Sequence, residues 1–527
     1  MKKFDNPGMQ LPTHVDTPET EDDSRKDKRE ISPTGPRVKT QDYVIMQSIR
    51  FVRQNLATLL AISAAVLIPC FWQRTIVAGD LGSHMYNAWL AQLIEHGQAP
   101  GLWLAQRWNN VLFDLLLDGL GRLFPWNVTE KIAVSLAVLI FFWGTVALVS
   151  AAARRVPWFV LPCIAMFAYG YSFHMGFFNF YISIGLSFFG IAIFWRGEGW
   201  ERLIPVVLAP LIMLAHPLGF AWLVAGSAYG TIAAAISRRF HILLLAASVA
   251  LVYAAHYYFW HHDVVQAQDN PLYFFNGSDQ LVLFGSRYAI IAYALLILTV
   301  AALLADVLSR GWRQGRWKDS AIPFQLYLIA YLAVILLPDG IRFGTQTTAL
   351  ALITERITSI SAAILCCLLG ATLPRRWHLV AFSAIAVVFF IFLYQDTAIV
   401  NLMETQVEQL VRTLPPGRRV LATIKPFPGS RVLIQHMLDR ACIGYCYSYG
   451  NYEPGSTWFR VRSSPGNQFV MNDFDSAADT EDGSYEVQPE DLPAYQVYQC
   501  SSTGKQLCIR ALEAGEMNDR LGVHQHE

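Results

Sequence analysis

Asp80 and His84 are the residues of this sequence whose types and spacing are best suited to chemistry. They stand where the first apolar segment ends and an amphipathic stretch begins. Because they are four positions apart, a helix would carry both side chains on one face. A carboxylate partly removed from water has a raised pKa that suits a general base, and a nearby histidine orients it or shares its proton. The pattern predicts a catalytic pair, and the alternatives are a helix cap at Asp80 and a solvated histidine.

Three further polar residues, His174, Asn179 and His216, fall at one end of neighbouring apolar segments. Polar groups at such positions tend to face a cavity rather than lipid. We expect these three side chains to help bind substrate, the alternative being that each is a hydrogen-bonded packing residue. A cluster of histidines as metal ligands has no diagnostic spacing here, so no metal-ligating residues are predicted, although a divalent metal stays open as a cofactor.

Two arginines are candidates for binding a phosphate group. Glu355 and Arg356 interrupt an apolar run, 348–354, and Arg342 lies in a short loop before it. A charge at the centre of a bilayer costs about 2.5–3.5 kcal/mol, so this pair is shielded or close to a membrane surface. Arg342 and Arg356 are therefore predicted to bind the phosphate of a lipid carrier and to offset charge on a departing phosphate. Interfacial anchoring is the alternative.

The elements that must hold these residues are membrane helices. Of the 527 residues, 54% are hydrophobic and 15% are charged, and the mean hydropathy is +0.33. Soluble domains average about 25% charged residues, so the composition indicates an integral membrane protein. The zero net charge gives no indication of nucleic-acid binding. About eleven segments are long and apolar enough to be candidate spans: 54–73, 129–151, 156–173, 177–195, 203–216, 218–236, 241–260, 288–308, 321–338, 357–373 and 378–395.

Basic residues follow alternate spans and predict the orientation of the chain. Cytoplasmic loops of membrane proteins are enriched in Lys and Arg. Applied to the arginines at 154–155, 196–202, 238–239, 310–318 and 375–376, this rule puts the N-terminus inside. The long loop that holds Asp80, and the polar region after the last span, are then outside.

Three domains are predicted from composition. Residues 1–49 are polar and lack aliphatic periodicity, which is typical of a disordered cytoplasmic tail. Residues 50–395 form the membrane domain, whose long first outer loop, 74–128, contains amphipathic segments at 83–96 and 108–123. Residues 396–527 are predicted to form a small α+β domain outside the membrane.

The cysteines support the outside location of that last domain. Cys442, Cys446, Cys500 and Cys508 all lie in it, and four cysteines in one polar region favour two disulfides and an oxidising compartment. Their spacing fits zinc ribbons poorly, and their connectivity is left open. The remaining four cysteines lie within apolar segments and are expected to be packing residues.

The sequence resembles the GT-C glycosyltransferases, polytopic enzymes that use polyprenyl-phosphate-linked sugars. The resemblance is carried by Gly79-Asp80 after the first span and by the segments 83–90 and 95–100. The second amphipathic segment and the outer C-terminal domain extend it. Segments 178–181 and 214–220 also look like bacterial members of this group.

The resemblance implies a predominantly α-helical polytopic enzyme in the bacterial inner membrane. It would make an inverting transfer of one sugar from a polyprenyl phosphate to a lipid, glycan or protein acceptor at the periplasmic face. Asp80 matches the first-loop acid, which in that family acts as base or helps to hold a metal. The loop 169–176 lacks the second acid that many members carry, so a metal site built on two such carboxylates is not expected.

Two other functions are left open by the sequence. One is a transporter or lipid flippase, which would show inverted repeats and polar breaks near the middle of the membrane. In this sequence the breaks and ionisable residues lie towards one side, and no repeat is visible. The other is a non-catalytic envelope assembly protein that acts through residues 396–527.

Overall fold

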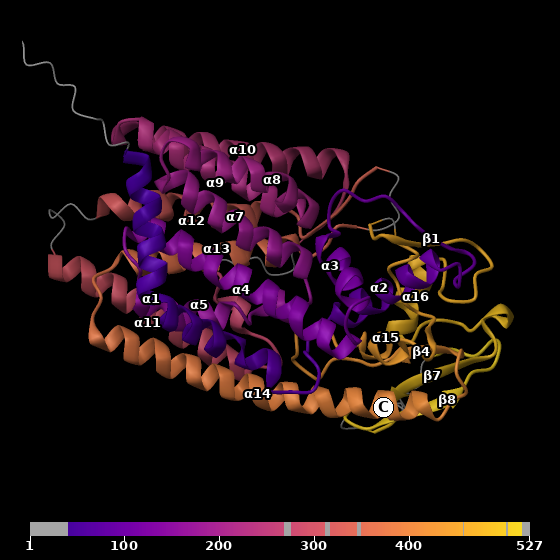
Figure 1. The fold of residues 1–527 in the computed structure, drawn as a ribbon. Coiled ribbons are helices and arrows are strands. Elements are labelled where there is room, and N and C mark those ends of the chain that lie inside the picture. The colour runs from indigo at the N-terminus through magenta and orange to yellow at the C-terminus, as the bar shows by residue number, and fades with distance from the viewer. Residues whose placement is uncertain are drawn as a thin grey trace, which may run out of the picture. The chain divides into compact units, whose positions relative to one another are not determined.

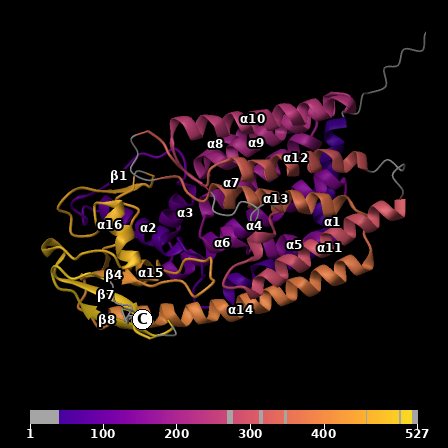
Figure 2. The same ribbon diagram turned by 180° about the vertical axis from the view of Figure 1, so that it is seen from behind.

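The structure is a computed structural model that describes residues 40–267, 276–310, 317–344, 349–456, 458–501 and 504–518. The chain divides into two units at residue 50, and the elements that form the site all belong to the second unit (Figures 1 and 2). Most of the predicted tail, 1–39, lies outside the described residues. The first helix begins at Thr40, so residues 40–49 are helical and not the irregular chain that we expected.

Long apolar helices dominate the structure, as the composition predicts. Eight helices in the described part of the chain are long and apolar enough to cross a membrane, which is consistent with a multi-pass membrane protein. They are α1 (Thr40–Phe71), α4 (Trp126–Ala153), α7 (Phe178–Arg196), α9 (Pro217–Ala235), α10 (His241–His262), α11 (Arg287–Arg310), α13 (Ile353–Ala371) and α14 (Arg376–Arg412).

Three of the eleven predicted spans are shorter or broken. Segment 156–173 forms a 3-10 turn followed by α5 (Leu161–Phe167) and α6 (Tyr171–His174). Segment 203–216 forms only the 12-residue α8 (Ile204–Ala215). The helix ends there because Pro217 has no N–H group to donate to the preceding turn. Segment 321–338 lies in α12 (Trp317–Leu336), whose apolar part is short.

Helices α4 and α7 pack closely against each other and run parallel. Phe141 stacks on Tyr181 with ring centroids 4.3 Å apart, and farther along both helices Gly144 meets Gly185. A Cβ atom at Gly144 would lie 2.2 Å from the carbonyl oxygen of Gly185. The two backbones are therefore in direct contact, and glycine is needed for that approach. Since the helices are parallel, the broken segment between them must travel back along the bundle.

Basic connections meet at one end of the bundle, which we call the basic end. Arg155 donates to the carbonyl oxygen of Thr372, and the Nε of Arg196 donates to that of Ala151 at 2.7 Å. Helix α2 (Leu81–Glu95), which begins directly after Asp80, lies towards the opposite end, where α4 begins (Figure 1). The segregation of basic residues that the sequence shows along the chain is thus also present in space.

The C-terminal region contains a small mixed sheet, as predicted. Its strands β4 (Arg419–Thr423), β5 (Tyr447–Ser448), β7 (Ala494–Gln499) and β8 (Leu507–Ala511) are ordered β5-β4-β7-β8. β4 is parallel to β5 and β7, whereas β8 is antiparallel to β7. Two short helices, α15 (Met437–Cys442) and α16 (Phe474–Asp482), accompany the sheet.

The cysteines are distributed as the sequence indicates. Cys442 pairs with Cys446 and Cys500 with Cys508, both at disulfide distance. The cysteines inside the apolar segments are buried and free; they are Cys70, Cys163, Cys366 and Cys367. The connectivity that the sequence left open is therefore local within each pair.

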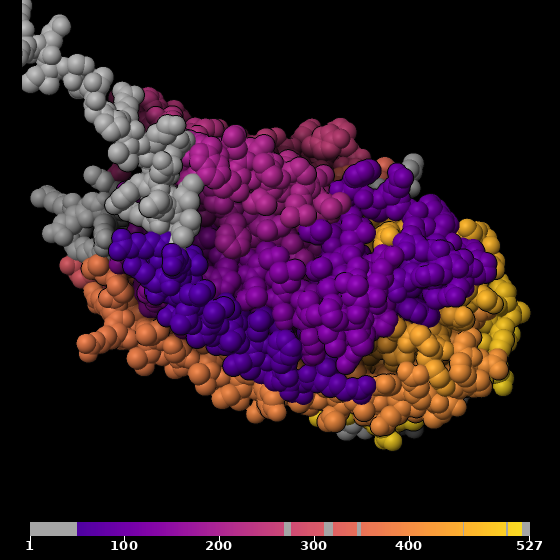
Figure 3. Space-filling model, in the orientation of Figure 1, coloured from indigo at the N-terminus to yellow at the C-terminus, as the bar shows by residue number. Residues whose placement is uncertain are grey.

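The first loop packs against the C-terminal region. Its two predicted amphipathic segments are the helices α2 (Leu81–Glu95) and α3 (Leu112–Gly121). Strand β1 (Leu102–Leu104) of this loop pairs antiparallel with β6 (Val461–Ser463), and Figure 3 shows the purple loop lying against the yellow C-terminal region. Most of α2 is buried, so it is an internal element of the structure. Helix α14 continues beyond the last predicted span, 378–395, as far as Arg412.

Replacing Gly144 by alanine is expected to destabilise the bundle. The added methyl group would overlap the backbone of α7, and overpacking of this kind costs about 1–3 kcal/mol. The measurement is thermal unfolding of the purified protein in detergent. Gly119→Ala in α3 is the matched control, because its Cβ would meet no atom within 4 Å. Equal stability of the two variants would contradict the close helix contact.

Candidate functional site

A cavity of about 520 Å³ lies where the first loop, the helical bundle and the C-terminal region meet. Three residues predicted from the sequence line it: Asp80, His216 and Arg356. The remainder of the wall is mostly apolar, with aromatic rings from several segments, among them Phe177, Phe259, Phe343, Tyr452, Trp458, Phe459 and Phe474. The cavity therefore combines one acid, one histidine and one arginine with a surface suited to hydrocarbon.

The backbone around Asp80 is held by the turn before α7. Gly79 and Asp80 donate their N–H groups to the carbonyl oxygens of His174 and Met175, at 2.7 and 3.0 Å. Gly176 has a φ of +83°, and a Cβ there would lie 2.6 Å from the nitrogen of Asp80. Asp80 occupies the N-cap position of α2, but its side chain makes no capping hydrogen bond. Capping alone therefore does not account for its carboxylate.

The carboxylate of Asp80 faces His436, a residue that the sequence did not single out. His436 Nε2 lies 3.8 Å from Asp80 Oδ1, and its Nδ1 lies 3.1 Å from Asp439 and 3.8 Å from Glu481. Its side chain is only 4% exposed. Helix α15 comes this close because position 82 is glycine: a Cβ there would lie 2.1 Å from the carbonyl oxygen of His436.

Burial and the charges around Asp80 act on its pKa in opposite directions. Burial raises the pKa of Asp80, and the positive charges of His436, His84 and Arg356 oppose that rise. Burial alone would lower the pKa of His436, but Glu481, Asp439 and Asp80 raise it to about 10. His436 is therefore an imidazolium ion at neutral pH that favours the ionised form of Asp80.

His84 does not pair with Asp80 as we expected. Its Nδ1 lies 2.7 Å from Asp114 of α3 and 3.6 Å from Glu453 of the C-terminal region. Asn179 donates to the second oxygen of Asp114 at 2.9 Å and so holds that carboxylate in place. The reason for the difference is tertiary. Helix α3 packs against α2 and places Asp114 within hydrogen-bond distance of His84.

The three residues His84, Asp114 and Glu453 also form a group that fits a metal ion. Their ligand atoms lie within 4.8 Å of one another, and an imidazole with two carboxylates is a donor set used for divalent transition metals. The sequence predicted no metal-ligating residues, and only His84 of this group was named, for another role. Within the group, His84 shares a hydrogen bond with Asp114, whereas Glu453 accepts one from Ser83 at 2.8 Å.

Arg356 reaches the cavity from the first turn of α13. Its guanidinium lies 4.1 Å from the ring centroid of Phe177, and one of its terminal nitrogens donates to the carbonyl oxygens of Ala351 and Leu352. Leu352 has a φ of +58°, a strained conformation for a leucine. Strain next to the cavity indicates that the position of this helix start is determined by its surroundings. The Nε of Arg356 is buried without a partner among the described residues.

Of the other predicted residues, His216 lines the cavity and three do not. His216 caps α9 by accepting from Leu218 N at 3.1 Å. His174 donates to the carbonyl oxygen of Val77 at 2.7 Å and supports the chain before Asp80. Asn179 acts through Asp114. Arg342 is exposed on β3 (Gly340–Arg342), although its two neighbours line the wall.

No family model matches the chain, and no curated protein and no solved structure shows significant similarity to it. What the protein does is therefore inferred from the cavity and the residues around it.

The stability of the protein is expected to fall at alkaline pH because of His436. Its pKa is raised from 6.5 to about 10, so the folded state holds this proton more tightly than the unfolded state. The resulting stabilisation is complete below pH 6.5 and is lost as the pH rises towards 10. Thermal unfolding between about pH 7 and 10 should therefore show a smaller decline for His436→Gln than for the wild type. His96→Gln, which alters an exposed histidine, should decline like the wild type, and parallel curves for all three would refute this role.

Proposed function

We propose that the protein is a membrane glycosyltransferase that moves a sugar from a polyprenyl phosphate to an acceptor hydroxyl group. The observation that carries this proposal is the convergence of Asp80, His216 and Arg356 on one largely apolar cavity. Apolar walls suit a polyprenyl chain, an arginine suits its phosphate, and a carboxylate of raised pKa suits the removal of a proton. The resemblance of the first loop to GT-C enzymes supports the same conclusion.

In the proposed reaction, Asp80 takes the proton of the acceptor hydroxyl as its oxygen attacks the anomeric carbon. The bond between that carbon and the phosphate oxygen breaks, and polyprenyl phosphate leaves with the electron pair. Arg356 offsets the charge that develops on the phosphate, in a site whose lining is mostly apolar. Attack from the side opposite to the leaving group inverts the anomeric configuration. His436 is a positioning residue, since it keeps Asp80 ionised and oriented without touching the substrate.

A divalent metal is not required for this scheme, because side chains of the protein perform each of its steps. Where a metal is present, His84, Asp114 and Glu453 are the residues that would hold it. It would supply positive charge beside Asp80.

We also propose that the cavity opens on the periplasmic side of a bacterial inner membrane. The basic end of the bundle is opposite to α2, which begins directly after Asp80, and the excess of Lys and Arg in cytoplasmic loops supports this orientation. Two cysteine pairs at disulfide distance in the C-terminal region are compatible with an oxidising compartment. A lipid, glycan or protein acceptor would approach from that side.

Asp80→Asn is expected to abolish most transfer while leaving the protein folded. Loss of a general base lowers rates by about 10²–10⁴-fold. The assay measures sugar transfer by the purified protein in lipid nanodiscs, supplied with a set of decaprenyl-phosphate-linked hexoses and pentoses. Asp118→Asn is the control, because Asp118 pairs with arginines of the same loop and the C-terminal region and does not line the cavity. Unchanged transfer by Asp80→Asn would contradict the proposal and favour a transporter or an assembly protein.

Arg356 and Arg342 are expected to behave differently. A charge-assisted hydrogen bond contributes about 1.5–3 kcal/mol, so Arg356→Gln should reduce kcat/KM for the lipid-linked donor by about 10–100-fold. Arg342→Gln should have little effect, since that side chain is exposed and away from the cavity wall. Steady-state kinetics with varied donor concentration distinguish the two. The opposite ranking would show that the phosphate binds at the exposed Arg342 and not beside Asp80.

A further inference from the structure

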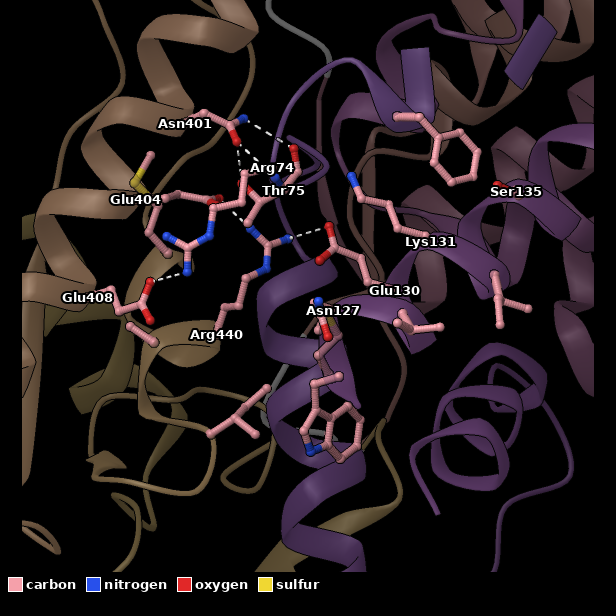
Figure 4. A pocket seen from close by; sticks show the side chains of 18 of the residues that line it. Arg74, Thr75, Asn127, Glu130, Lys131, Ser135, Asn401, Glu404, Glu408 and Arg440 are labelled. Atoms are coloured by element: carbon pink, nitrogen blue, oxygen red, sulfur yellow. Dashed lines mark hydrogen bonds and ion pairs between the residues drawn. The ribbon is translucent and has the colours of Figure 1, made fainter. Parts of the chain in front are cut away.

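A second and larger cavity, of about 930 Å³, lies between α1, α4, α14 and α15 (Figure 4). Neither Asp80 nor Arg356 lines it, so it is separate from the candidate site. Its walls come from the end of α1, the first half of α4, the last part of α14 and the short helix α15. These parts of the helices adjoin the first loop and the C-terminal region.

The lining of this cavity changes in character along the helices. Apolar side chains come from within the membrane-spanning parts of α1 and α4; they are Leu67, Phe71, Ile132, Leu136 and Leu139. Charged side chains come from the adjoining helix ends and α15; they are Arg74, Glu130, Lys131, Glu404, Glu408, Arg412 and Arg440. One cavity with an apolar part and a charged part has the profile of an amphiphile, with hydrocarbon chains at one end and a polar headgroup at the other.

The balance of charge favours an anionic headgroup. Four basic side chains face three acidic ones, which leaves one net positive charge in the cavity. Arg74 pairs with Glu408, and Arg440 pairs with Glu404 and, at 3.4 Å, with Glu130. The first turn of α4 also lines the cavity and adds the positive end of a long helix dipole. A phosphodiester carries one negative charge and would neutralise this excess.

Lys131 keeps one N–H group that a headgroup in the cavity would bind. Lys131 donates to the carbonyl oxygens of Cys70 and Gln73 at 2.7 and 3.2 Å, which uses two of its three N–H groups.

We propose that this cavity binds a phospholipid of the surrounding bilayer. Its phosphodiester would bind Arg74, Lys131 and the first turn of α4, and its acyl chains would lie along the apolar part of α1 and α4. The proposal does not depend on the transferase reaction. It does have a bearing on the candidate site, because Arg440 lies on the short helix that begins directly after His436, so a bound lipid would stabilise the element that faces Asp80.

The test is native mass spectrometry of the full-length protein after delipidation, with phosphatidylglycerol, diacylglycerol or decaprenyl phosphate added back. Wild-type protein should retain one phosphatidylglycerol molecule and no diacylglycerol, which lacks the phosphate. Arg74→Gln combined with Lys131→Gln should weaken retention at least about tenfold, on the scale of one charged hydrogen bond. Arg287→Gln is the control, because Arg287 pairs with Asp396 of α14 outside the cavity.

A second variant leaves the charges unchanged. Leu136→Trp would fill the apolar part of the cavity and should also reduce retention of phosphatidylglycerol. The proposal is overturned if both variants bind this lipid as the wild type does, or if diacylglycerol is retained equally well. Preferential retention of decaprenyl phosphate would overturn it too, since the cavity would then hold an isoprenoid carrier and not a bilayer lipid.

Discussion

The buried polar contact between α2 and the C-terminal region determines the arrangement of the whole site. Ser83 donates to Glu453 at 2.8 Å, and Asn87 donates to Asn451 at 3.0 Å. Asn451 donates in turn to Asp439 at 3.0 Å. Buried polar groups are costly unless each finds its partner, so a network of this kind permits one docking position and penalises others. The first loop and the C-terminal region consequently behave as a single element.

This contact also explains the electrostatics of Asp80. Docking removes the carboxylate from most of the solvent, and it brings in His436, which the first loop by itself could not supply. Desolvation and the nearby imidazolium act on the pKa of Asp80 in opposite directions. The pKa of Asp80 is raised in balance, and both opposing influences on it depend on the docking of the two regions.

The features that could be predicted from the sequence, most of the helices and the position of Asp80, depend on local patterns of apolar and charged residues. Long apolar runs identified most of the helices, and an acid placed directly after such a run identified Asp80. His84 was matched to the wrong acid, because helical spacing says which residues share a face but not which neighbouring helix crosses that face. The sequence could not distinguish the roles of Arg342 and Arg356. In the structure Arg342 lies on β3, which pairs with β2 (Val264–Gln266), and its side chain is exposed.

The residues that the sequence did not reveal are in the C-terminal region. His436 and Glu453 lie in irregular segments without periodicity, so nothing in their surroundings distinguished them from solvated loop residues. The broken segment 156–173 had the composition of a span, and its division by Gly170 was not apparent from hydropathy. Composition and periodicity indicate which segments are apolar enough to span a membrane. The positions of His436 and Glu453 and the break at Gly170 depend instead on contacts between distant parts of the chain.

The contact between Ser83 and Glu453 joins residues that are 370 positions apart. During synthesis, the first loop is translated long before the residues of the C-terminal region that pair with it. Until then the acid of that loop lacks the imidazolium opposite it, and the cavity lacks the side that the C-terminal region supplies. The surroundings of Asp80 are therefore completed only when the last part of the chain has been made.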